Sequence, residues 1–154
     1  KAELNFYDYD NECSSLIQRA DGNRDGAAPI SYKVPVRTLD DFVQEHGIRS
    51  IDLLKVDTEG FDLNVISGAR KMYADGQIRI TMFEFASGWY STKRNLLEVV
   101  EFLKEFPDYK LYRLFNGFIV PFVWSPRNEN YAMGSMFVIK RNDVEVSIRD
   151  DITF

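Results

Sequence analysis

The chain has 154 residues, of which 45% are hydrophobic and 14% aromatic, and this suffices for one domain with a substantial core but hardly for two. Its formal net charge of -5, from 19 basic and 24 acidic residues without a dense basic run, argues against wrapping of a nucleic-acid backbone. We therefore expect residues 1–154 to form a single domain that does not bind nucleic acid.

Cysteine and histidine are too scarce for a disulfide or a zinc site. Cys13 is the single cysteine and His46 the single histidine, so no set of these residues has zinc-ligand spacing. The longest apolar runs, such as "FIVPFVW" at 118–124, are much shorter than the roughly 20 residues that span a bilayer. With no signal peptide recognised, the expectation is a soluble, cytoplasmic protein without a membrane partner.

The first third of the chain predicts two strands and a helix. "AELNFYDYD" at 2–10 is strand-like, and 11–29 is rich in the Gly, Asn, Asp and Ser of turns, which predicts a loop. "ISYKVPV" at 30–36 alternates like a strand, and its proline suits a sheet edge. A short helix follows, with Thr38 as its N-cap and Gly47 as its end.

The remaining two thirds alternate between strands and helices. The pattern predicts a strand at 50–57, a helix at about 61–75 that ends at Gly76, and a strand at 78–85. A third helix is expected to be capped by Ser91 and closed by Pro107. Further strands are predicted at 109–115, 117–124 and 135–141.

This alternation indicates an α/β sheet with helices on both faces. The crossover helix predicts that strands 51–57 and 78–85 are adjacent and parallel. Ligands of such sheets bind beyond the carboxyl ends of the strands, where Asp57, Glu59 and Glu84 fall.

The segment "LLKVDTEG" at 53–60 brings three charges to the end of a hydrophobic strand. Because side chains alternate, Lys55, Asp57 and Glu59 share one face. The two carboxylates can serve a reaction, or they can solvate the strand end and favour the start of the next helix. Lys55 is either catalytic or an ion-pair partner that neutralises the cluster. Glu84 needs a pairing partner, a metal or a place at the sheet end, because an ionised carboxylate in an apolar strand is costly.

Three further residues are site candidates. His46 is most simply a helix-end residue stabilised by the dipole, with a catalytic base as the alternative. Trp89 and Tyr90 follow the strand that carries Glu84 and either line an acceptor pocket or cover a helix start.

The run "VPVRTLDDFVQEHGIRSIDLLKVDTEGFDLNVISGARKM" at 34–72 resembles the FkbM family of S-adenosylmethionine-dependent methyltransferases. The likeness lies in a "TLDDF"-like helix, a hydrophobic strand that ends "K-hydrophobic-D-x-E-G", and a later acidic residue and "GA" pair. It implies a Rossmann-like methyltransferase sheet, mostly parallel, in which the final two strands form an antiparallel edge hairpin.

The resemblance also implies where the cofactor binds. In the family, a glycine loop after the first strand and an acidic residue ending the second hold S-adenosylmethionine. We expect both upstream of Lys1, because "ADGNRDGAAP" at 20–29 lacks the strand–loop–helix context of such a loop. The chain is thus interpreted as the C-terminal part of the domain, apparently without the cofactor-binding strands. Residues 1–154 alone are expected to bind S-adenosylmethionine poorly. Either an N-terminal segment is missing or the protein is a remnant that cannot hold its cofactor alone, and a homo-oligomer stays open as a partner.

For the activity, the resemblance implies methyl transfer, and we expect the acceptor to be a hydroxyl of a small molecule or sugar. Asp57, Glu59 and Lys55 are the catalytic candidates, with Asp57 taking or orienting the acceptor proton. Asp57 and Glu84 could instead hold a divalent metal such as Mg²⁺. Trp89 and Tyr90 are the substrate-binding candidates.

Two other classes of function stay open at this stage. One is a noncatalytic α/β binding or interaction module related to methyltransferases, because a cut sheet leaves an edge and apolar surface to be covered. The other is a dinucleotide- or nucleotide-dependent enzyme on the same architecture.

Overall fold

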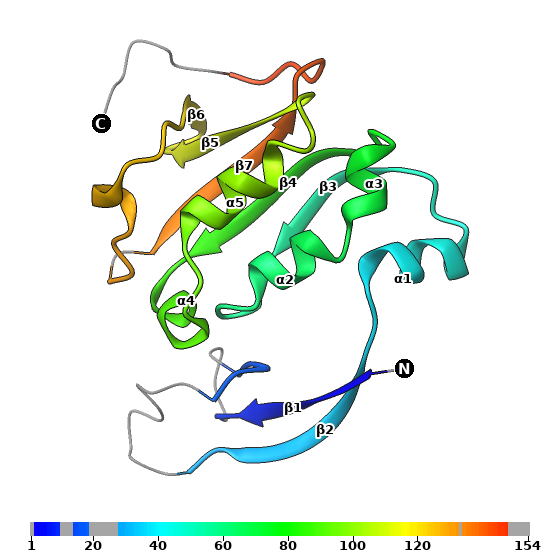
Figure 1. The fold of residues 1–154 in the computed structure, drawn as a ribbon, viewed down its shortest axis with the longest axis vertical. Coiled ribbons are helices and arrows are strands. Elements are labelled where there is room, and N and C mark those ends of the chain that lie inside the picture. Colours follow the sequence, from blue (N-terminus) through cyan, green and yellow to red (C-terminus); the bar gives the residue numbers. More distant parts are fainter. Residues whose placement is uncertain (1, 10–13, 19–27, 133, 148–154) are drawn as a thin grey trace.

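The strands of the protein form two separate β-sheets. The structure is a computed structural model that describes residues 2–9, 14–18, 28–132 and 134–147. One sheet has two strands and the other has five (Figure 1). The elements in chain order are β1 (Ala2–Asp8), β2 (Ile30–Val36), α1 (Leu39–His46), β3 (Ile51–Val56), α2 (Asp62–Ser67), α3 (Arg70–Ala74), β4 (Ile78–Phe85), α4 (Ser87–Thr92), α5 (Leu96–Leu103), β5 (Tyr109–Phe115), β6 (Phe118–Pro121), a 3-10 turn (Pro126–Asn128) and β7 (Ser135–Arg141).

The small sheet is the antiparallel pair β1–β2, in which Ala2 lies opposite Val36. Both predicted strands of this region are confirmed. Most of the predicted loop between them lies outside the described residues, as does Cys13. The carboxyl ends of β3 and β4 point toward α4 and this small sheet (Figure 1).

The large sheet has the strand order β3-β4-β7-β5-β6. Strands β3 and β4 are adjacent and parallel, with Leu53 opposite Ile80, so the prediction from the crossover helices is confirmed. The other three pairs are antiparallel, so the expectation of a mostly parallel sheet was wrong. The sheet is mixed because no helical crossover separates the last three strands.

The edge hairpin is formed by β5 and β6, joined at Asn116 and Gly117. Both turn residues have positive φ, 40° and 88°, as the tight turns favoured in hairpins require. The last strand, β7, does not lie at the edge, because it inserts between β4 and β5. The prediction that the final two strands pair with each other at the edge was therefore wrong for β7.

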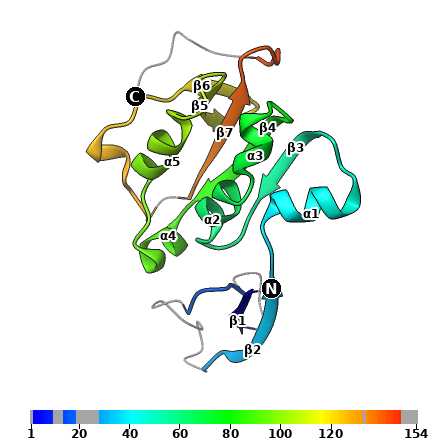
Figure 2. The same cartoon turned by 45° about the vertical axis from the view of Figure 1, so that its right-hand side comes forward.

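Among the described elements, the helices that pack on the large sheet cover one face only, so the expectation of helices on both faces was wrong (Figure 2). Ile66, Met72 and Phe102 from the helices pack against Phe83 and Ile139 of the sheet. The opposite face carries a smaller buried cluster drawn from strands alone: Tyr112, Ile119 and Val138, with Ile80, Met82 and Leu114 partly buried beside it. The described chain thus has a helix-covered face and a strand-only face.

The single helix predicted at 61–75 is two helices, α2 and α3, which meet at Gly68 and Ala69. A residue of α1 stabilises the break between the two helices: the Asp40 carboxylate accepts hydrogen bonds from the N–H groups of Lys71 and Met72. The Gly68 carbonyl in turn accepts from the Asp40 N–H. Asp40, in the first turn of α1, therefore caps the start of α3.

The predicted third helix begins later than expected. Asn95 is the N-cap of α5, with a reciprocal capping box to Glu98, whereas Ser91 lies inside the short helix α4. Lys93, at φ 57°, separates the two helices by ending α4 in the left-handed region. The start of the first helix at Thr38 is confirmed, because its side chain accepts from the Asp41 N–H.

Candidate functional site

The segment that follows β3 is a tight turn, and its backbone is unusual. Strand β3 ends at Val56, and Glu59 and Gly60 then adopt positive φ values of 54° and 100°. A positive φ is uncommon for glutamate, which shows that the surrounding structure holds this turn. The turn sets the position of the carboxylates at the strand end.

Asp62, at the start of α2, organises this turn from inside. The residue is 1% exposed, and its carboxylate accepts hydrogen bonds from the N–H groups of Thr58 at 3.3 Å and Gly60 at 3.1 Å. Burial raises the pKa of the Asp62 carboxyl, and the hydrogen bonds from the turn partly offset this effect. Asp62 therefore stabilises the conformation of residues 58–60.

Two contacts from distant segments also hold the turn. The buried Ser15 hydroxyl lies 3.3 Å from the carbonyl oxygens of both Thr58 and Glu59. The backbones of Gly60 and Gly88 pack so closely that a Cβ placed on Gly60 would lie 2.3 Å from the Gly88 carbonyl. The start of α4 and the N-terminal region thus converge on this one turn.

Three carboxylates meet beside the turn. Asp57, Glu59 and Glu84 each place one oxygen within 4.8 Å of the others. Asp57 and Glu84 come from the ends of the parallel strands β3 and β4, as the sequence predicted. The Lys55 ammonium lies 2.7 Å from the Asp57 carboxylate, and both side chains are about half exposed. We call these four residues the acidic cluster.

Glu84 is a partly buried carboxylate in an otherwise apolar strand, where the sequence predicted that an ionised group would be costly. Burial, and then repulsion from Glu59 and Asp57, raise the pKa of the Glu84 carboxyl above its ordinary value. Its carboxylate lies against a backbone without a side chain, because a Cβ on Gly134 would be 2.7 Å from Glu84 Oε1. A raised pKa in a cluster of this kind is typical of functional carboxylates.

The two aromatic candidates have different environments. Trp89 is 1% exposed, and its indole N–H donates to the Glu84 carbonyl at 2.8 Å. Tyr90 is 69% exposed, and its ring lies against Tyr131. Of the pair, Tyr90 is therefore the side chain that solvent can reach, whereas Trp89 positions the strand that carries Glu84.

His46 stays at the end of α1. Its Nδ1 lies 2.9 Å from the Phe42 carbonyl oxygen, and its ring stacks on the Phe42 ring. This environment fits the helix-end interpretation of the sequence.

Strand β3, the turn that follows it and the residues that hold this turn all lie in a region that matches one known family. A family model described as the methyltransferase FkbM domain matches residues 5–114, which is more than half of the chain. The chain belongs to this family. Searches among curated proteins and solved structures give no match.

As an FkbM methyltransferase domain, the chain has methyl transfer as its indicated activity, and the noncatalytic interaction module is not favoured. The matched region contains the whole acidic cluster, whereas Gly134 lies after it.

No helix among the described residues is long and apolar enough to cross a membrane.

Sequence reasoning found the carboxylates of this FkbM domain but missed the residues that hold them. Asp62, Ser15 and Gly88 were not predicted as site residues, and their contacts are long-range or loop-specific. A usable signal existed for Asp62, since a lone acidic residue in the apolar stretch after "EG" has to be buried or capping. Nothing local marked Gly88 as a partner of Gly60.

Proposed function

We propose that this FkbM domain catalyses S-adenosylmethionine-dependent methyl transfer to a hydroxyl group of a small molecule or sugar. The observation that carries the proposal is the acidic cluster at the carboxyl ends of β3 and β4, where ligands of α/β sheets bind. A carboxylate beside an acceptor hydroxyl can orient it and take its proton.

In this proposal the chain's own residues act on the acceptor. The Asp57 carboxylate, at the exposed rim, accepts the hydrogen bond of the acceptor hydroxyl and then its proton. Lys55, 2.7 Å away, fixes the orientation of that carboxylate and balances its charge. The Glu59 carboxylate completes the cluster, and its position follows from the turn that Asp62 and Gly88 hold.

Glu84 has a second role in the proposal. Its raised pKa makes it a better proton acceptor near neutral pH than an ordinary glutamate, so it can receive the proton from Asp57 or from bound water. Tyr90, with its exposed ring, is the candidate for contact with the acceptor. Trp89 stabilises β4 through the hydrogen bond from its indole N–H to the Glu84 carbonyl.

The cofactor supplies an electrophilic methyl group, and holding it requires a glycine-rich turn between a strand and a helix. The described residues do not fit this requirement: β2 connects to α1 through Arg37 and Thr38 without a glycine, and the turn after β3 packs its glycine against Gly88. We therefore assign no described residue of this chain to the cofactor and derive no step through it.

The direct test of the proposal is transfer of a labelled methyl group. The full-length protein is incubated with methyl-tritiated S-adenosylmethionine and a panel of sugars and small hydroxyl compounds. Retention of label on an acceptor after treatment with strong base is expected, because a methyl ether resists base and a methyl ester does not. Label found only in esters or amines would contradict the hydroxyl assignment, and no transfer to any acceptor would contradict the proposed function.

The alternative role for Asp57 and Glu84 is to hold Mg²⁺, which prefers carboxylate oxygens. Because Lys55 already supplies a positive charge next to Asp57, we expect excess EDTA to change turnover by less than about twofold, whereas removal of a required metal would abolish it. Turnover before and after chelation, with Mg²⁺ added back, measures this. Restoration by Mg²⁺ of an activity lost in EDTA would assign the two carboxylates to a metal.

Glu84→Gln is expected to stabilise the fold near neutral pH while lowering turnover. With its pKa raised in the folded state, Glu84 binds more protons folded than unfolded, so its contribution to the free energy of unfolding falls as pH rises above about 4.3. The uncharged amide of glutamine does not ionise, so the variant avoids this fall in the free energy of unfolding. Thermal melts should show a higher melting temperature for Glu84→Gln near pH 7, and the difference should shrink toward pH 4. A variant less stable than wild type near pH 7 would show that the ionised carboxylate has a stabilising partner.

A further inference from the structure

We propose that Tyr90 and Tyr131 form a binding subsite for the ring of a neutral sugar, which then places one of its hydroxyl groups at the acidic cluster. This subsite depends on the proposed function, because it presupposes that the methyl acceptor reaches the cluster. Tyr131 lies on the connection between β6 and β7, after the region that matches the family model. The preference for an acceptor thus comes in part from a segment outside the matched domain.

The two tyrosine rings form a corner at the end of the large sheet. Tyr90 is 69% exposed on α4, and its ring centroid lies 5.9 Å from that of Tyr131, with 71° between the ring planes. Tyr131 also packs against the ring of Phe85, the last residue of β4, at 5.0 Å between centroids. The Tyr131 hydroxyl donates to the Arg94 carbonyl at 3.0 Å. These contacts hold Tyr131 between the strand end and α4, and Tyr131 in turn limits the positions open to the exposed Tyr90 ring.

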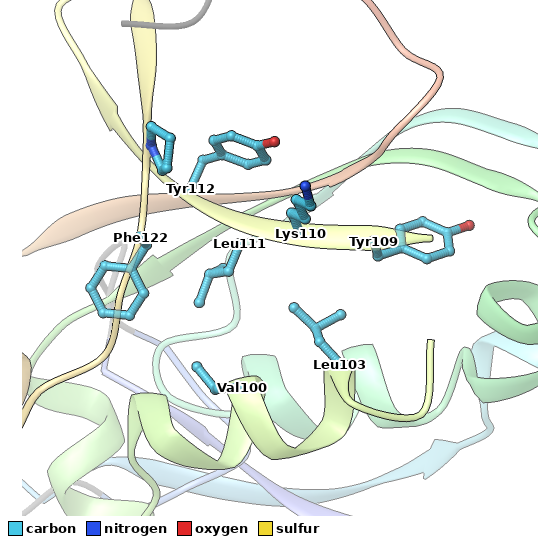
Figure 3. A pocket seen from close by; sticks show the side chains of 8 residues that line it. Val100, Leu103, Tyr109, Lys110, Leu111, Tyr112 and Phe122 are labelled. Atoms are coloured by element: carbon cyan, nitrogen blue, oxygen red, sulfur yellow. The ribbon is translucent and has the colours of Figure 1, made fainter. Parts of the chain in front are cut away.

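The connection that carries Tyr131 is attached to the rest of the domain at two places. At its start, the Phe122 N–H donates to the Leu111 carbonyl, and both side chains line a groove of about 460 Å³ between β5 and α5 (Figure 3). Further along, the Glu129 carboxylate accepts hydrogen bonds from the first two N–H groups of α5. A side chain on a segment held in this way binds a ligand with little further loss of conformational entropy.

Both rings lie close in sequence to backbone that contacts the acidic cluster or its turn. Tyr90 follows Gly88 by two positions, and the Gly88 backbone packs against the turn after β3. Tyr131 precedes Gly134 by three positions, and a Cβ on Gly134 would lie 2.7 Å from Glu84 Oε1. Both ribbon views show the connection reaching the end of β4 beside α4 (Figures 1 and 2). Because two or three residues span at most about 7 to 11 Å, a sugar bound against the rings can bring a hydroxyl to the cluster.

Aromatic rings next to several carboxylates suit a sugar as the ligand. A sugar ring exposes C–H groups on its faces, and these pack against an aromatic ring. An ionised carboxylate only accepts hydrogen bonds, so neighbouring hydroxyl groups of one sugar can donate to more than one carboxylate of the cluster. Three acidic side chains and one lysine make up the cluster, and its excess of negative charge repels an anionic acceptor. The subsite therefore favours a neutral sugar over an acidic one.

The test is saturation-transfer NMR with the full-length protein and the methyl glycosides of neutral hexoses, without S-adenosylmethionine. We expect transfer to C–H protons of at least one hexoside, and binding of the corresponding hexuronoside that is at least about fivefold weaker. Catechol, a planar compound with two neighbouring hydroxyl groups, is the competitor. The proposal would be overturned by a lack of binding of every neutral hexoside, by equal binding of hexoside and hexuronoside, or by catechol binding tighter than every hexoside.

Variants then locate the subsite on the protein. Tyr131→Leu and Tyr90→Leu should each weaken hexoside binding about fivefold, because each removes one aromatic ring. Tyr131→Phe keeps the ring and loses only the bond to Arg94, so its affinity should stay within about twofold of wild type. Phe42→Leu is the matched control and should bind normally, because Phe42 is a 39% exposed ring that stacks on His46, before the amino end of β3.

In the labelled-methyl assay, Tyr131→Leu should raise the KM for the acceptor and leave kcat within about twofold, since the rings bind ground state and transition state alike. Equal effects of Tyr131→Leu and Phe42→Leu, or equal losses in Tyr131→Leu and Tyr131→Phe, would overturn the subsite and leave methyl transfer intact. Hexoside binding that depends on both tyrosines, in a protein that transfers no methyl group, would contradict the proposed function alone. Tyr90→Leu decides the question if Tyr131→Leu does not fold, because the Tyr90 side chain is largely exposed.

Discussion

Asp57→Asn is expected to lower turnover at least tenfold while leaving the free energy of unfolding within about 1 kcal/mol of wild type. The small structural effect follows from the exposure of the Lys55–Asp57 ion pair, since exposed pairs contribute little to stability. The large kinetic effect follows from the loss of a positioned proton acceptor, which typically costs about 10²- to 10⁴-fold in rate. Cofactor affinity should be nearly unchanged, because the asparagine removes an interaction used mainly in the transition state.

The matched control is Asp52→Asn on the same strand. Asp52 also forms an exposed ion pair, with Arg79 at 2.9 Å, but it lies near the amino end of β3, away from the acidic cluster. Turnover by Asp52→Asn should equal that of wild type. If Asp57→Asn keeps normal turnover and has a much lower melting temperature, the charges at the end of β3 belong to the fold and the functional interpretation fails.

The neighbouring positions of β3 and β4 could be predicted because one local rule decides them. A strand, a short helical crossover and a second strand place the strands side by side and parallel, so Asp57 and Glu84 had to end at one edge of the sheet. The position of β7 follows no comparable rule. Its pairing with both β4 and β5 depends on which apolar faces meet across the sheet, and the spacing along the chain does not specify this.

Helix boundaries were predicted where the cap is local and missed where it is distant. Thr38 caps α1 within one turn, which sequence spacing reveals. The break between α2 and α3 depends on Asp40, about thirty positions away along the chain, whose carboxylate replaces the missing helical partners. Apolar periodicity continues through that break, so the pattern alone favours one long helix.

The candidate site, too, has a part that the sequence predicted and a part that it missed. The residue types and the strand period predicted the convergence of Asp57, Glu59 and Glu84. Their fine positions depend on a buried carboxylate, Asp62, and on backbone contact between two loops, and no periodicity encodes either. The sequence therefore predicted which carboxylates converge, and the structure shows which residues hold them in place.

Gly88→Ala is expected to lower the free energy of unfolding by about 2 kcal/mol, as overpacking of a fixed backbone does. A Cβ on Gly88 would lie 2.4 Å from the Glu59 carbonyl oxygen, which is far inside normal contact. The turn cannot simply move away, because Asp62 and Ser15 both bond to its backbone. Chemical denaturation of wild type and variant measures the change.

Local helix propensity at Gly88 acts in the opposite direction, so the sign of the measured change distinguishes the two effects. Gly88 lies in the first turn of α4, where alanine favours the helix by up to about 1 kcal/mol over glycine. Gly47→Ala is the control: its Cβ would have nothing within 4 Å, so only the positive φ of 65° opposes it, at a cost of about 1 kcal/mol. If the close approach of the two loops holds Glu59 in place, Gly88→Ala must be the more destabilised variant and must also lose turnover, whereas Gly47→Ala keeps it. A Gly88→Ala protein at least as stable as wild type would show that the two loops separate easily and do not fix the acidic cluster.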